Sequence, residues 1–269
     1  MTEFPIVLNW QFDPVLIGSL VTAAVCYFLA IGPLRERIAP GQVFPSGRAA
    51  VFAAAIILTY LVEGSPLHDL SERYLFSAHM FQHLAITYFC APLFIWGLPT
   101  WLLRPLLLNP VMRPVAKLFS NPVVAAFSFA LFLSLWHIPA IYDAGLRNSS
   151  LHHSQHIIFM LISFIYWWPV MSRLPELPAL GYGTQILYLF ATSTVLQLPL
   201  FGLVTFSSEP FYSTYINAPR IWFESALSDQ QMAGVVMKVL ALIFYSPPII
   251  VIFARWYRDS QRRGYVRPA

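Results

Sequence analysis

The sequence predicts an all-α integral membrane protein, a bundle of about seven transmembrane helices. Hydrophobic residues make up 58% of the 269 residues and charged residues only 10%, and the mean hydropathy is +0.63. A chain of this composition cannot cover a water-soluble core with polar surface. Seven apolar runs approach the roughly 20 helical residues that are needed to cross a hydrocarbon core of about 30 Å.

The predicted spans form a single membrane domain, 1–269. In order, they are 15–34, 49–63, 74–98, 121–137, 153–171, 184–204 and 231–254. The second and fourth are short and must extend into their flanks. Helices are expected because backbone amides in lipid must bond within their own segment, and these runs lack the alternation typical of a membrane barrel.

The first run is expected to be a retained helix. The residues before it carry Glu3 and Asp13 but no Lys or Arg, so they lack the basic start of a cleaved signal peptide. Cys26 and Cys90 both lie inside apolar runs, which indicates neither a disulfide framework nor a cysteine-rich metal motif.

Basic residues predict the orientation. Most of the 16 Lys and Arg fall in alternate loops or in the tail after the last span: Arg35, Arg37, Arg48, Arg104, Arg113, Lys117, Arg173, Arg255, Arg258, Arg262, Arg263 and Arg267. This asymmetry places the C-terminus in the cytoplasm and the N-terminus outside.

Two connections are long. Residues 99–120 mix leucines with Arg104, Arg113 and Lys117, which is typical of a broken segment lying on the cytoplasmic lipid surface. Residues 205–230 form an outer aromatic loop that could cap the bundle or dock a partner. Membrane lipid is therefore an expected partner, and no motif supports nucleic-acid binding.

Two histidine pairs begin predicted spans. His79 and His83 lie four residues apart at the start of the third span, and His152 and His156 repeat the His-x-x-Gln-His pattern at the start of the fifth. This spacing stacks two imidazoles on one helix face, about 6 Å apart. His137 ends the fourth span. All seven histidines are expected on the outer side of the membrane.

These histidines predict a metal or cofactor site, because polar groups inside a membrane are costly unless they have a function. Imidazoles suit copper, zinc, iron or nickel. Met160 extends the face of the second pair, and a thioether beside imidazoles would favour Cu(I). Haem held between two histidines, as in a membrane oxidoreductase or electron-transfer protein, is an alternative, and a retinal Schiff base on Lys238 is a third.

Several blocks of sequence carry a family resemblance. They are Phe76-Ser-Ala-His79-Met80-Phe-Gln82-His83, Ala91-Pro92-Leu, Gly97-Leu-Pro99, Trp136-His137-Ile-Pro139-Ala-Ile-Tyr142-Asp143-Ala, Leu151-His152-His-Ser-Gln-His156 and Asp229-Gln230-Gln231-Met-Ala233-Gly234. In these blocks the sequence resembles the CtaG family of cytochrome c oxidase assembly factors, in the multi-span form.

This resemblance implies a non-enzymatic assembly factor of the bacterial cytoplasmic (inner) membrane. It would act as a metallochaperone that handles copper, as Cu(I), for the catalytic subunit of cytochrome c oxidase. The positions shared with the family are His79, His83, His137, Asp143, His152, His156 and Asp229. Asp143 and Asp229 would orient imidazoles or relay an ion.

Two residues depart from the family pattern. Gln155 stands where the family commonly has Glu before its last histidine, which removes a possible carboxylate from that helix. Lys238 stands where an apolar or aromatic residue is common. A cation there would sit awkwardly beside a cationic metal.

Overall fold

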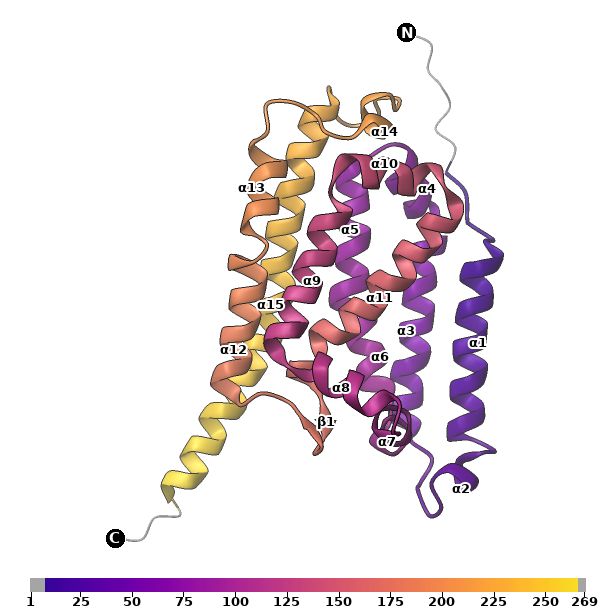
Figure 1. Ribbon diagram of the computed structural model, residues 1–269, viewed down its shortest axis with the longest axis vertical. Helices are drawn as coiled ribbons and strands as arrows, with labels where there is room; N and C mark the ends of the chain where they lie inside the picture. Colours follow the sequence, from indigo (N-terminus) through magenta and orange to yellow (C-terminus); the bar gives the residue numbers. More distant parts are fainter. Residues whose placement is uncertain (1–7, 266–269) are drawn as a thin grey trace.

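The computed structural model describes residues 8–265 of the chain. Its elements are α1 (Pro14–Ile31), α2 (Arg35–Ile38), α3 (Ser46–Gly64), α4 (Pro66–Arg73), α5 (Phe76–Ala85), η1 (Ile86–Cys90), α6 (Ala91–Gly97), α7 (Thr100–Leu108), α8 (Met112–Ser120), α9 (Pro122–Trp136), α10 (Pro139–Arg147), α11 (Ser149–Met171), β1 (Arg173–Leu174), β2 (Leu177–Pro178), α12 (Tyr182–Phe190), η2 (Ala191–Val195), α13 (Leu198–Phe206), α14 (Ser213–Ile216) and α15 (Ala226–Tyr265). Figure 1 shows them as a bundle of long, roughly upright helices with short helices at both ends.

The predicted all-α membrane bundle is confirmed. Among the described residues, five helices are long and apolar enough to cross a membrane, and up to seven segments qualify if each of two bent helix pairs counts as one span. The second predicted span extends at both ends to become α3, Ser46–Gly64. The fourth stays short as α9, Pro122–Trp136, and is preceded by a sharp bend.

Two of the spans contain a π-helical turn. Ile86–Cys90 joins α5 to α6, and Ala191–Val195 lies between α12 and α13. A π-turn widens the helix by one residue and shifts the side chains that follow it. Lys238 of α15 contacts the second π-turn, where its Nζ donates to the Ser193 carbonyl at 3.3 Å.

The predicted surface segment consists of α7 and α8. The α7 axis bends by 97° from the span that precedes it, and α8 bends by 85° from α9. Both short helices lie across the lower end of the bundle in Figure 1. The Arg173 guanidinium anchors this end, because it donates to the Ile95 and Leu98 carbonyls at 2.8 and 3.0 Å.

The upper end is built from α4, α10, α14 and the starts of α5, α11 and α15 (Figure 1). Asp229 on α15 caps α5: its carboxylate accepts the amide N–H of Phe76 at 2.7 Å and the Ser77 hydroxyl at 2.6 Å. The aromatic loop caps the bundle, since Tyr212 and Tyr215 are buried there beside Tyr142. This end therefore has a fixed framework on which the histidines are held.

Candidate metal centre

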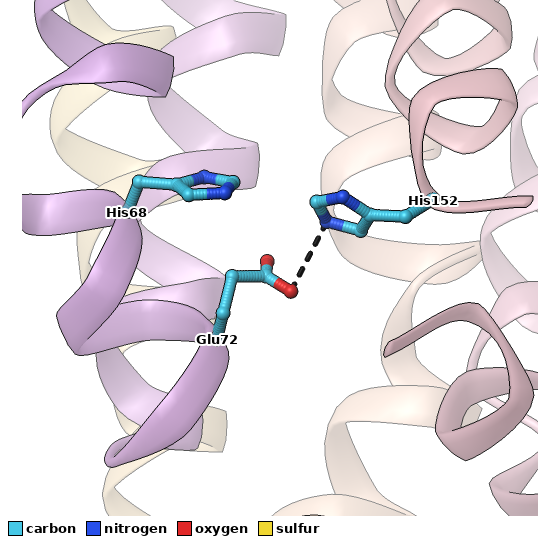
Figure 2. Close-up of side chains that lie close together, drawn as sticks. All are labelled: His68, Glu72 and His152. Atoms are coloured by element: carbon cyan, nitrogen blue, oxygen red, sulfur yellow. Dashed lines mark ion pairs between the residues drawn. The ribbon is translucent and has the colours of Figure 1, made fainter. Parts of the chain in front are cut away.

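A short helix outside the membrane spans supplies the centre of the site. α4 begins at Pro66, where the Ser65 hydroxyl caps its first turn, and carries His68 and Glu72 four residues apart. This spacing puts both side chains on one face of the helix. That face is turned toward His152 on α11 (Figure 2).

Three of these groups converge. His68, Glu72 and His152 each offer a possible ligand atom, and these atoms lie within 4.8 Å of one another. The Glu72 carboxylate also reaches α5: Oε2 lies 3.1 Å from His152 Nε2, and Oε1 lies 3.3 Å from His79 Nδ1. Glu72 is thus the bridge between the two histidine pairs.

Below this bridge the imidazoles continue into the bundle. The rings of His79 and His83 have centroids 4.2 Å apart, and those of His152 and His156 are 4.4 Å apart. The ring centroids of His83 on α5 and His156 on α11 lie 5.8 Å apart. His156 Nδ1 lies 2.5 Å from Oε2 of Glu63, at the end of α3. We call these residues the histidine–glutamate cluster: Glu63, His68, Glu72, His79, His83, His152 and His156.

The cluster has many buried atoms without hydrogen bonds. Within the described part of the chain, such atoms include both ring nitrogens of His79 and His156, Nδ1 of His83, and one carboxylate oxygen each of Glu63 and Glu72. The short imidazole–carboxylate contacts therefore have ion-pair distances without hydrogen-bond geometry. Buried polar atoms without partners are costly, and a cation accepted by their lone pairs would satisfy several at once.

The electrostatics of α4 suit a cation. Burial raises the pKa of Glu72, but the neighbouring imidazoles of His152 and His79 outweigh it and hold this pKa well below its usual range. Burial lowers the pKa of His68, although Glu72 and Glu63 oppose that shift. A charged Glu72 carboxylate beside a neutral His68 imidazole is the protonation state that binds a metal ion.

Gln82, within the first motif, supports His68. Its amide nitrogen lies 3.3 Å from His68 Nδ1 and donates to the Val62 carbonyl at 2.9 Å, while its oxygen accepts from Ser71. The side chain is completely buried. Such a partner fixes the orientation of a ligand imidazole.

Four of the five predicted histidines come together in the cluster: His79, His83, His152 and His156. Among the described residues, His137 makes no ring contact with these four, and its Nε2 lies 3.4 Å from the Met80 sulfur. Met160 is partly buried and packs against two apolar clusters.

The two predicted aspartates, Asp143 and Asp229, each accept hydrogen bonds from groups at the start of another helix. Asp143 accepts the backbone N–H groups and the hydroxyls of Ser213 and Thr214 at 2.7–3.2 Å, and so fixes the start of α14. Asp229 caps α5 as described above. The carboxylates beside the imidazoles are instead Glu63 and Glu72.

Sequence reasoning missed Glu63, His68 and Glu72 as site residues. One signal was available, because His68 and Glu72 have the same four-residue spacing as the two recognised pairs. Gln155 removes a possible carboxylate from α11. Glu63 on α3 and Glu72 on α4 supply acidic groups beside the imidazoles in its place. The Lys238 ammonium donates to the Ser193 carbonyl and lies 5.9 Å from the Phe201 ring centroid.

Comparison with known proteins gives one family match. The model of a family described as "Cytochrome c oxidase caa3 assembly factor (Caa3_CtaG)" matches residues 25–259. Similar curated proteins include uncharacterized proteins of Mycobacterium bovis and Mycobacterium tuberculosis, each 24% identical over 94% of this chain. The chain spans only 40% of the length of these relatives. No solved structure gives a significant match.

Proposed function

Because the chain belongs to the cytochrome c oxidase caa3 assembly factor family, we propose that it binds copper and passes it to the catalytic subunit of a cytochrome c oxidase. The protein would work in the inner membrane of a bacterium, with the histidine–glutamate cluster at the outer side. Copper is then the cargo of the protein, and its transfer is a ligand exchange that needs no catalysed bond chemistry.

One observation carries this proposal: His68, Glu72 and His152 converge to within 4.8 Å beneath the end of the bundle. Imidazole nitrogens bind copper well, and a carboxylate contributes the charge that compensates a buried cation. His79 lies on the other side of Glu72, and His83 and His156 continue the row of ligand atoms inward. A row of alternative ligands lets an ion move by exchange of one ligand at a time.

The proposal is tested by the metal content of two proteins. Cells that make the oxidase would carry either the wild-type chain or the double variant Glu72→Gln/His152→Ala. The purified wild-type chain is expected to retain near-stoichiometric copper, and the variant to bind it at least tenfold more weakly. The oxidase isolated from the variant cells should contain less copper.

His153→Ala is the matched control. His153 is the immediate neighbour of His152, but it points to Asp13, whose Oδ2 lies 3.0 Å away. This variant should retain both copper and oxidase assembly. Wild-type copper levels in the double variant would contradict the proposal, and so would a purified wild-type chain that has a Soret band and no copper.

A further inference from the structure

Met80 and His137 form a pair of soft donor atoms outside the histidine–glutamate cluster. The Met80 sulfur lies 3.4 Å from His137 Nε2, and both side chains are buried, with exposed fractions of 2% and 5%. Met80 follows His79 on α5, and one residue turns a helix by about 100°, so Met80 points to a different face. His137 reaches this face from the end of α9.

The hydrogen bond of Nδ1 determines whether Nε2 of His137 carries a hydrogen or a free lone pair. His137 Nδ1 lies 2.7 Å from the Leu133 carbonyl oxygen, which can only accept, so Nδ1 carries the hydrogen. In a neutral imidazole Nε2 then has a free lone pair. The thioether of Met80 is also only an acceptor. Two acceptors therefore face each other in a buried place, where a protonated imidazolium is disfavoured.

A metal ion satisfies both acceptors. Bonds of about 2.0 Å to imidazole nitrogen and about 2.3 Å to sulfur can join atoms up to about 4.3 Å apart, so a separation of 3.4 Å allows a bent bridge. A bent bridge leaves a further position open for the ligand that delivers or receives the ion.

The surroundings favour the reduced ion. The rings of Phe76 and Tyr142 each lie 6.5 Å from the His137 ring, and the Tyr212 hydroxyl donates to the His137 carbonyl at 3.1 Å. Within the described part of the chain, no carboxylate forms a hydrogen bond or ion pair with the side chain of Met80 or His137. Thioether and imidazole in an apolar, aromatic place suit Cu(I), whereas the carboxylates of the cluster suit harder divalent ions.

We propose that Met80 and His137 form a second metal subsite, selective for Cu(I), next to the histidine–glutamate cluster. The proposal rests on the proposed function for the presence of copper, and it adds a division of labour. The cluster holds divalent metal through nitrogen and oxygen, and the Met80–His137 subsite holds Cu(I) through sulfur and nitrogen.

The test compares Met80→Leu with Met160→Leu in the full chain. Leucine conserves the volume of methionine, so both variants should fold. Each protein is loaded anaerobically with Cu(I) or separately with Zn(II), and X-ray absorption then reports sulfur at about 2.3 Å from copper. The wild-type chain and Met160→Leu should show this sulfur. Met80→Leu should lose it and bind Cu(I) at least tenfold more weakly, with unchanged Zn(II) binding.

The converse variant is Glu72→Gln/His152→Ala, which should lose the Zn(II) and the copper held by the cluster. When it is loaded with Cu(I), it should keep the copper–sulfur signal of the Met80–His137 subsite. Wild-type chain that binds Cu(I) through nitrogen alone would overturn the subsite while leaving the proposed function intact. A sulfur signal that survives in Met80→Leu would also overturn it. Wild-type chain that binds no copper in either redox state would overturn the proposed function itself.

Discussion

The side chains of Asp229 and Ser77 share a hydrogen bond of 2.6 Å although 152 residues separate them in the sequence. The same carboxylate accepts the backbone N–H of Phe76 and of Ser77, two of the amides that a helix leaves free in its first turn. α15 therefore caps α5, the helix that carries His79, Met80 and His83. This relationship fixes the position of the ligand-bearing helix within the bundle.

Replacing Asp229 should loosen α5. Asp229→Asn keeps one acceptor oxygen but loses the charge that complements the start of the helix, so we expect it to destabilise the fold by about 1–2 kcal/mol. Thermal unfolding in detergent measures this change. Asp259→Asn is the control on the same helix, because Asp259 accepts a hydrogen bond from Tyr182 at the far end of α15, away from α5. Metal affinity should fall in the Asp229 variant and stay unchanged in the control.

Glu63 and His156 should behave as one unit. Their atoms lie 2.5 Å apart in a buried place, so removing one partner leaves the other uncompensated. In metal-free protein, Glu63→Gln and His156→Gln should each lower the free energy of unfolding. The loss in the double variant should be smaller than the sum of the two single losses by about 0.5–3 kcal/mol. A double-mutant cycle of unfolding free energies measures this coupling. Strict additivity would show that the two groups do not interact.

Asp143 gives the aromatic loop a pH dependence. Burial raises the pKa of this carboxyl, but hydrogen bonds from Ser213 and Thr214 outweigh it and lower the pKa below 3.8. The group therefore stabilises the fold above pH 3.8, and this contribution is lost as the pH falls through the lowered pKa. Asp143→Asn should lower the unfolding temperature near neutral pH, and the gap to wild type should narrow as the pH falls through the lowered pKa. A gap that does not change with pH would contradict this account.

Gly234 marks a close approach of α15 to α13. A Cβ at this position would overlap the Thr205 hydroxyl and lie 3.0 Å from the Thr205 Cβ. Gly234→Ala should therefore destabilise the fold by about 1–3 kcal/mol. Thr205→Ala removes the hydroxyl and should restore part of this loss in the double variant. Gly18→Ala is the control, because a Cβ there meets no atom within 4 Å.

The spans were predictable because the bilayer dictates their length and composition. The predicted third span, 74–98, corresponds to the continuous helical segment Phe76–Gly97, and the predicted surface segment, 99–120, corresponds to α7 and α8. Both histidine pairs were also visible, since their spacing is a property of a single helix. The pairing of Met80 was not visible, because its partner His137 lies on a different helix.

By itself, the sequence determined the all-α membrane bundle and the two helix faces that carry His79, His83, His152 and His156. Hydrophobic length and the four-residue period are local properties, so they can be read along the chain. Only the tertiary structure decided that Glu63 and Glu72, rather than Asp143 and Asp229, stand beside the imidazoles. The sequence places all of these carboxylates at the same end of the bundle and does not show which of them lie beside the histidines. The packing of α3 and α4 against α5 and α11 brings Glu63 and Glu72 there.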